Sequence, residues 1–325
     1  MPSPSSAGLR RRHVVAALAA LSGAGGVPAG AQGSLPREVR IGFQKGSAIL
    51  VLIKKQEVIE RRLKALGVPA VKWVEFQFGP PMLEALGAGA IDLGSVGDTP
   101  PVFAQAGGSR LVYAAATPSA QHAVLVPKNS PIRTVAELKG RKVAFGKGSS
   151  AHNVTVKALA QAGLTFDDIV PTYLSPADAT AAFNGGNIDA WVVWDPYYAI
   201  AEERYGARAI ADTSDKRLAS SSYYMAGQDF AARHPAVLAA VLDEVRKTTE
   251  WAGQHRDALA ALAAEATGID AKSWSAAFAR AEFSVGPVTP AHVAQQQQLA
   301  DTFQALGIIP RKLDVSTIVW RAPGA

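Results

Sequence analysis

A glycine-broken turn between an apolar run and a helix is the clearest chemical feature of the sequence. In residues 143–153 (VAFGKGSSAHN), two glycines and an alanine fit the dinucleotide pattern G-x-G-x-x-A. The other phosphate loop, G-x-x-x-x-G-K-[ST], is absent, because Lys147 lies between the glycines. What remains is a predicted helix N-terminus, whose free backbone N–H groups and the hydroxyls of Ser149 and Ser150 favour an anion.

The chain contains this pattern twice, which indicates two similar α/β lobes. Residues 40–48 (RIGFQKGSA) match residues 142–150 (KVAFGKGSS) position by position. Further along, AGAID at 88–92 and GDTP at 97–100 resemble GGNID at 185–189 and WDPY at 194–197. In both copies a cap residue precedes a proline, which predicts helix starts at Thr99-Pro100 and Asp195-Pro196.

Short apolar runs alternate with alanine-rich helical stretches, which predicts parallel α/β sheets. The expected strands are Val39–Phe43, Ala123–Val126, Lys142–Phe145 and Ala190–Trp194. In open α/β sheets, ligands lie beyond the carboxyl ends of the strands. We therefore expect four loops to face one crevice between the lobes, namely those at Gln44, Asp98-Thr99, Ser149 to Asn153 and Trp194-Asp195. Micromolar affinity needs about 8 kcal/mol, so several donors must converge there.

The first 31 residues predict an export signal rather than part of the fold. Arginines at 10–12 precede an apolar run, and Ala29-Gly30-Ala31 has the small-x-small form of a cleavage site. The apolar run is too short to span a bilayer, and the arginines leave the general and the twin-arginine export routes open. We therefore expect an exported protein.

Composition argues against several other classes of protein. Without the three arginines of the export segment the formal net charge falls from +6 to +3, and the basic residues form no stripe. A nucleic-acid partner is therefore not expected. The chain has no cysteine and six scattered histidines, so neither a metal nor another cofactor is expected. The remaining length of about 290 residues suggests two lobes.

Taken together, the motifs resemble the aliphatic sulfonate-binding proteins of bacterial ABC importers. The resemblance rests on IGFQKG at 41–46, GDTPP at 97–101, FGKGSSAHN at 145–153 and WVVWDPYY at 191–198, and extends through VLVPKNSP at 124–131 and LGIIP at 306–310. It implies an α/β, bilobal periplasmic-binding-protein fold of type II. On this resemblance, residues 35–125 and 223–325 form the first lobe and residues 126–222 the second, with hinge crossings near His122–Leu125 and Ser222–Ala226.

The resemblance also implies a monomeric receptor that closes on an alkanesulfonate and delivers it to a membrane permease for sulfur acquisition. The residues that it places in the cleft are Gln44, Gly97, Asp98, Thr99, Ser149, Ser150, His152, Asn153, Trp194, Asp195 and Tyr223, with Tyr224 as the alternative to Tyr223. A sulfonate stays ionised and has three acceptor oxygens, so it needs N–H and O–H donors on all sides.

Several alternatives stay open at this level. Asp98 and Asp195 are acceptors when ionised, so they can serve as helix caps instead of ligand contacts. Trp191 and Trp194 lie on opposite faces of one strand, so at most one faces the cleft. A receptor for taurine, nitrate or another small anion would share the fold. A periplasmic enzyme would have only His152, Asp98 and Asp195 as acid or base, so we expect a binding protein.

Overall fold

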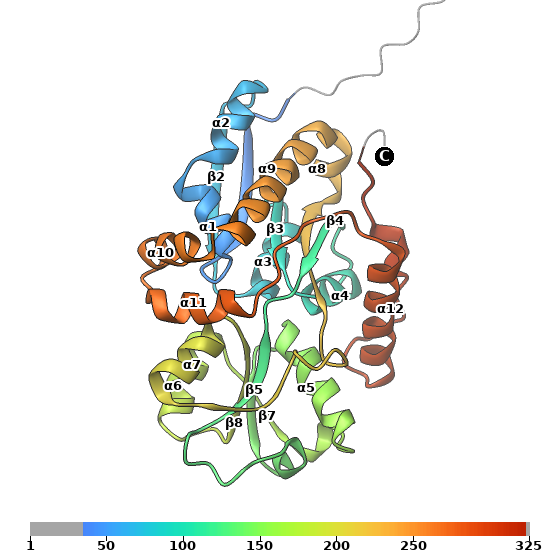
Figure 1. Ribbon diagram of the computed structural model, residues 1–325. Coiled ribbons are helices and arrows are strands. Elements are labelled where there is room, and N and C mark those ends of the chain that lie inside the picture. Colours follow the sequence, from blue (N-terminus) through green and yellow to red (C-terminus); the bar gives the residue numbers. More distant parts are fainter. Residues whose placement is uncertain (1–34, 323–325) are drawn as a thin grey trace, which may run out of the picture. The chain divides into compact units, whose positions relative to one another are not determined.

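The structure is a computed structural model that describes residues 35–322, and the predicted export signal lies outside the described residues. Its strands form two five-stranded sheets (Figure 1). Sheet A has the order β2 (Ala70–Phe76), β1 (Glu38–Gln44), β3 (Leu93–Val96), β10 (Ser221–Gly227) and β4 (Leu111–Pro118). Sheet B has the order β7 (Val170–Tyr173), β6 (Lys142–Phe145), β8 (Ala190–Trp194), β5 (His122–Val126) and β9 (Arg208–Asp212).

Each sheet is mixed, so the prediction of wholly parallel sheets is wrong in one respect. In sheet A, β1 is parallel to β2 and β3, whereas β10 is antiparallel to β3 and β4. In sheet B, β6 is parallel to β7 and β8, whereas β5 is antiparallel to β8 and β9. The reversed strand in each sheet is the one that the chain enters from the other sheet.

The internal repeat has the same structural role in both sheets. The carboxylate of Asp92, just before β3, accepts the backbone N–H of Arg40 in β1 at 2.7 Å. The carboxylate of Asp189, just before β8, accepts the backbone N–H of Lys142 in β6 at 2.8 Å. Each aspartate therefore joins the beginnings of two neighbouring parallel strands.

The chain passes between the sheets twice, at residues 119–121 and 213–220. The backbone N–H of His122 donates to the Thr213 hydroxyl at 2.9 Å, and the backbone N–H of Thr213 donates to the His122 carbonyl at 3.0 Å. The hinge positions expected from the resemblance lie inside β5 and β10, so the passages between the sheets come a few residues earlier in the chain.

Helices pack on both sheets. Those on the sheet A side are α1 (Ala48–Lys55), α2 (Val58–Ala65), α3 (Gly79–Gly87), α4 (Thr99–Ala106), α8 (Gln228–Arg233), α9 (Pro235–Gln254) and α12 (Pro290–Ala305). Those on the sheet B side are α5 (Ser150–Gln161), α6 (Pro176–Asn184) and α7 (Tyr197–Tyr205). The described residues also form three 3-10 turns, Val135–Leu138, Phe166–Asp168 and Val315–Ile318.

Two further helices are α10 (Arg256–Thr267) and α11 (Ala271–Ala279). Helix α10 packs against α1, and α11 packs against α10 and against α7 on the sheet B side. Their buried side chains form one apolar cluster with α1 and with Ala199 of α7. Figure 1 shows α11 next to α7. No helix within residues 35–322 is both long and apolar enough to cross a membrane.

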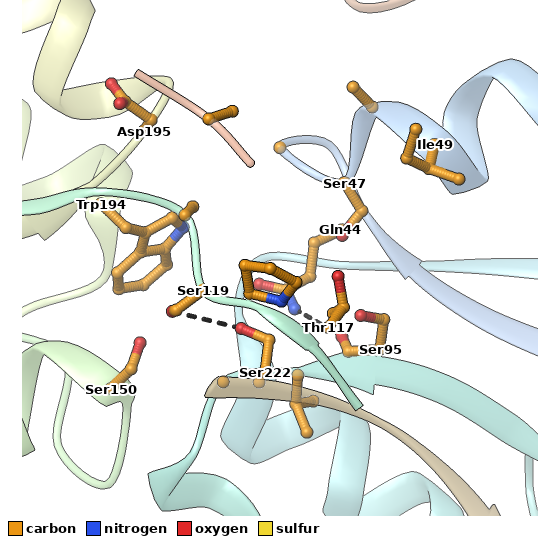
Figure 2. A pocket seen from close by; sticks show the side chains of 18 of the residues that line it. Gln44, Ser47, Ile49, Ser95, Thr117, Ser119, Ser150, Trp194, Asp195 and Ser222 are labelled. Atoms are coloured by element: carbon orange, nitrogen blue, oxygen red, sulfur yellow. Dashed lines mark hydrogen bonds between the residues drawn. The ribbon is translucent and has the colours of Figure 1, made fainter. Parts of the chain in front are cut away.

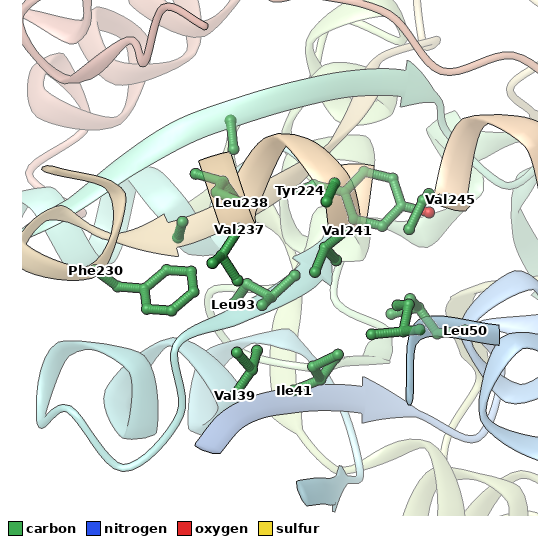
Figure 3. Close-up of a cluster of buried hydrophobic side chains, with 14 of the residues drawn as sticks. Val39, Ile41, Leu50, Leu93, Tyr224, Phe230, Val237, Leu238, Val241 and Val245 are labelled. Carbon is green, nitrogen blue, oxygen red and sulfur yellow. The ribbon is translucent and has the colours of Figure 1, made fainter. Parts of the chain in front are cut away.

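The largest core cluster lies between sheet A and α9 (Figure 3). Val237, Leu238, Val241 and Val245 are buried along one face of α9, as their helical spacing predicts. Burying each such side chain contributes about 1.5 to 3 kcal/mol relative to leaving it exposed. This packing fixes β1 and β3, whose carboxyl ends carry the loops of the candidate site.

Candidate ligand-binding site

A pocket lies between the two sheets, at the ends of the strands where the sequence predicts a ligand. Its cavity volume is about 190 Å³. In Figure 2, Gln44, Ser47 and Thr117 from the sheet A side face Trp194 and Ser150 from the sheet B side. The first turns of α1 and α5 both reach its wall, so two helix N-termini with their positive dipole ends meet there.

The wall of this pocket carries no lysine or arginine among the described residues. Its polar side chains are mostly hydroxyls and one amide, contributed by Gln44, Ser47, Ser95, Thr117, Ser119, Ser149, Ser150, Ser222 and Thr249. The acidic side chains on the wall are Asp195 and Glu282. The pocket therefore offers neutral donors and helix dipoles to an anion rather than a cationic side chain.

Six of the predicted site residues lie on this wall: Gln44, Gly97, Ser149, Ser150, Trp194 and Asp195. Trp191 is buried on the other face of β8, as strand alternation predicts. Gly97 allows sheet A to approach α5 closely, because a Cβ placed there would lie 2.7 Å from the Cβ of Ser150. Any larger residue at position 97 would push the two sides of the pocket apart.

Five predicted residues lie behind the wall instead: Asp98, Thr99, His152, Asn153 and Tyr223. The first turn of α5 directs Ser149 and Ser150 to the pocket, and the following residues His152 and Asn153 are buried against neighbouring helices. In β10, Tyr224 lines the pocket and Tyr223 does not, because neighbouring residues of a strand point to opposite faces.

Asp98 and Asn153 form a buried contact between the two sides of the molecule. The side-chain amide of Asn153 in α5 donates to Asp98 Oδ2 at 2.5 Å, and the Thr99 hydroxyl donates to Asp98 Oδ1 at 2.9 Å. Burial raises the pKa of Asp98, which these hydrogen bonds and the charge of Lys157 oppose. Asp98 is thus a structural acceptor that joins sheet A to α5.

His152 has a similar position at the contact between the two sides. Its ring centroid lies 5.0 Å from that of Phe145 in β6 and 5.1 Å from that of Phe303 in α12. Burial lowers the pKa of His152 to about 4, and the charge of Lys147 acts in the same direction. The neutral ring accepts the backbone N–H of Gly148 through Nδ1 at 3.3 Å. His152 therefore packs as an aromatic residue.

His122 is a pocket residue that the sequence did not single out as a ligand contact. It is 2% exposed, and burial lowers its pKa to about 4. Its Nδ1 lies 2.7 Å from the carbonyl of Ala120, which can only accept, so Nδ1 carries the proton. Nε2, 2.7 Å from Ser150 Oγ, must then accept the Ser150 hydroxyl proton. The Ser150 hydroxyl is therefore committed to His122.

The Ser149 hydroxyl is committed as well, since it donates to the carbonyl of Gly146 at 2.7 Å. The hydroxyl of Thr117 and the indole N–H of Trp194 make no hydrogen bond to the described protein. Thr117 was missed because it lies at the end of β4, a strand that no motif marks. The only sequence signal is that small polar residues follow both β4 and β9 at the passages between the sheets.

Asp195 lies on the wall but is paired with Arg280, which donates to both of its carboxylate oxygens at 2.9 Å. The carboxylate also accepts the backbone N–H of Ala199 at 3.1 Å. Helix α7 begins at Tyr197, not at Pro196 as predicted. Within residues 35–322, no group of three or more acidic or histidine side chains is placed to hold a metal ion.

The chain has two α/β lobes, each with a mixed sheet, which are joined by two passages and have a pocket between them. These features define it as a bilobal solute-binding protein of the periplasmic type. It belongs to the NMT1-like family, whose sequence profile matches residues 32–268. This confirms the α/β, type II fold predicted from the motifs.

Three matches, two of them to the Escherichia coli relative, show where the chain lies within that family. A curated aliphatic sulfonates-binding protein of Escherichia coli strain K12 is 44% identical over 291 residues, 89% of this chain and 90% of its own. The crystal structure of the periplasmic aliphatic sulphonate binding protein from Escherichia coli matches with a TM-score of 0.80 at 43% identity, covering 90% of this chain and 94% of that chain.

The third is the alkanesulfonate-binding protein from Xanthomonas axonopodis pv. citri, solved bound to MOPS. It matches with a TM-score of 0.84 at 37% identity, covering 88% of this chain and 99% of its own. Both relatives are binding proteins and not enzymes.

Proposed function

We propose that this chain is the periplasmic receptor that binds aliphatic sulfonates and delivers them to the permease of an ABC importer. It is a binding protein, as the motifs predicted, and not an enzyme. Residues 1–31 direct export, residues 35–118 and 221–322 form the first lobe, and residues 122–212 form the second, with the passages at 119–121 and 213–220 between them. The relatives named above support this role.

The observation that carries the proposal is a pocket between two helix N-termini whose wall, within residues 35–322, holds neutral donors and no cationic side chain. A sulfonate carries one negative charge at any physiological pH, and its three oxygens only accept hydrogen bonds. Dipoles and neutral donors compensate a single charge without a counterion. A doubly charged phosphate or sulfate would lie near Asp195 and Glu282 without a cation on the wall, so we expect it to bind poorly.

We assign the ligand contacts to a subset of the wall groups that make no hydrogen bond to the described protein. They are the side chains of Thr117 and Trp194, the second amide hydrogen of Gln44 and the backbone N–H groups that begin α5. Gln44 donates its first amide hydrogen to the Ser95 carbonyl at 3.0 Å, which fixes its orientation (Figure 2). Ser150 is hydrogen-bonded to His122, and Asp195 is paired with Arg280, so these two wall residues do not donate to the ligand.

The outer part of the wall favours a sulfonate with a carbon chain over nitrate. Ile49, Leu50, Phe278 and Phe283 line the pocket, and they offer apolar surface that nitrate cannot cover. Taurine has a short chain with a terminal ammonium, so it remains the nearest alternative ligand.

A calorimetric titration of residues 32–325 tests this function. We expect C2 to C8 alkanesulfonates to bind with a dissociation constant of about 1 µM or below. Sulfate, phosphate and nitrate should give no binding heat. Binding of taurine alone would change the ligand within the same fold, and the absence of binding across the whole panel would contradict the proposal.

The free hydroxyl of Thr117 gives a sharper test of the contacts. Thr117→Val keeps the size of the side chain but removes its O–H, and we expect sulfonate affinity to fall at least about tenfold, because a hydrogen bond to a charged group contributes about 1.5 to 3 kcal/mol. Thr117→Ser should bind within about twofold of the wild type. Ser150→Ala should cost less than Thr117→Val, since the Ser150 proton is held by His122. The reverse order would show that our assignment of donors is wrong.

A further inference from the structure

An ion pair lies directly behind the pocket wall, outside the proposed ligand contacts. Arg280 follows α11, and its Nε and Nη2 donate to the two oxygens of Asp195, each at 2.9 Å. Its Nη1 donates to Oε2 of Glu202 in α7 at 2.7 Å. The guanidinium carbon lies 3.7 Å from the ring centroid of Tyr198. One arginine side chain thus contacts three residues at and after the end of β8.

This ion pair is better protected from water than its neighbours. The side chain of Asp195 is 5% exposed and that of Arg280 is 27% exposed. Burial alone would lower the pKa of Arg280, but the hydrogen bonds and charges of Asp195 and Glu202 outweigh it, so the pKa is raised. Arg204 of α7 also pairs with Asp270 before α11, yet these side chains are 49% and 39% exposed. Exposed pairs contribute little, whereas bidentate arginine–carboxylate pairs are strong and geometrically specific.

The two partners belong to opposite sides of the pocket. Asp195 and the neighbouring Trp194 line it from the sheet B side. Phe278 and Ala281, just before and after Arg280, line it from the segment around α11, which packs on α1 and α10. Arg280 itself lies behind the wall rather than on it. Separation of the two sides would therefore have to break all of its hydrogen bonds at once.

We propose that Arg280 is a positioning residue for ligand retention. Its bidentate contact with Asp195 holds the Trp194 wall against the segment around α11, so that the pocket opens slowly. The inference rests on the proposed function, because it concerns release from the same pocket. Arg280 acts through Asp195 and does not touch the ligand.

The first test compares ligand dissociation rates in Arg280→Gln, Arg280→Lys and the control Arg204→Gln, followed by stopped-flow tryptophan fluorescence. Arg280→Gln should release an alkanesulfonate at least about tenfold faster, with a smaller change in association rate. Arg280→Lys keeps the charge without the bidentate geometry and should lie between. Arg204→Gln removes an exposed arginine from the same pair of helices and should stay within about twofold of the wild type.

A second measurement uses the ligand-free protein, so that it does not depend on the identity of the ligand. The sequence contains no cysteine. Cysteines introduced at the exposed positions Lys72 in β2 and Val170 in β7 therefore label one site on each side for electron-spin distance measurements. Arg280→Gln should shift the distance distribution to longer values, and Arg204→Gln should not.

These outcomes separate the two proposals. If the wild type binds no sulfonate, the proposed function is wrong, and the ligand-free distances alone decide the role of Arg280. Unchanged dissociation rates and distances in Arg280→Gln would overturn the inference, as would an equal effect of Arg204→Gln. If Arg280→Gln does not fold, Arg280→Lys decides, and a wild-type dissociation rate in that variant would overturn the inference.

Discussion

Between pH 8 and pH 5, the free energy of unfolding of His152→Phe should fall by about 2 kcal/mol less than that of the wild type. Burial holds the pKa of His152 at about 4 in the folded state, against the ordinary value of 6.5 in the unfolded chain. As the pH falls below 6.5, the His152 side chain binds a proton in the unfolded chain but stays neutral in the folded chain. The contribution is therefore fully present above pH 6.5 and is lost progressively toward pH 4. His122, with a pKa lowered by burial to about 4, adds a second such loss.

Urea unfolding followed by tryptophan fluorescence at several pH values measures this slope. Phenylalanine suits the aromatic surroundings of position 152 and does not titrate, so the readout is the pH dependence and not the absolute stability. Asp98 and Asp195, whose pKa values are raised by burial, act in the opposite direction in both proteins and cancel in the comparison. His255→Gln, at an exposed position, shows what removal of a histidine does by itself. An unchanged slope in His152→Phe would mean that His152 has the same pKa in the folded and the unfolded protein.

Replacing Asn153 with alanine should lower the free energy of unfolding by about 3 kcal/mol. Asn153 donates the 2.5 Å hydrogen bond to the buried carboxylate of Asp98, and its removal leaves that charge with the Thr99 hydroxyl as its remaining side-chain donor at short distance. The loss should exceed that of a neutral hydrogen bond, since a buried charge without its partner is costly.

A double-mutant cycle separates this charge effect from simple loss of packing. In an Asp98→Asn background the carboxylate is replaced by a neutral group of the same size, so Asn153→Ala should cost only about 1 kcal/mol. The coupling energy of the pair is then about 2 kcal/mol. Equal losses in both backgrounds would show that Asp98 is already neutral or that another donor takes over.

The four strands that the sequence predicted lie inside the sheets and are mostly buried, although β3, β4 and β10 are mostly buried too and were not predicted. The runs beginning at Val39, Ala123, Lys142 and Ala190 became β1, β5, β6 and β8, which lie inside the two sheets. The strands β2, β7 and β9 lie at sheet edges and are only partly buried, so their sequences lack a continuous apolar run. Edge strands depend on pairing with a formed sheet, which local composition does not encode.

The loops of the site were predictable, whereas the direction of each side chain was not. The repeat and the helix starts placed Gln44, Ser149 and Trp194 near one crevice, and all three line the pocket. Asp98 and Asn153 belong to the same loops but turn toward each other, because packing of α5 against sheet A decides their orientation. The role of His122 could not be predicted, because it depends on the Ala120 carbonyl and Ser150, which lie on either side of its ring.

The two passages between the sheets have a consequence for protein engineering. His122 and Thr213 are joined by two hydrogen bonds, so the contiguous stretch that builds sheet B begins and ends at one point. Such a stretch can be transplanted as a cassette between homologues, because its two junctions occupy adjacent positions in donor and acceptor. Chimeras made in this way would show which half of the chain selects the ligand and, on the proposed function, which half a permease recognises.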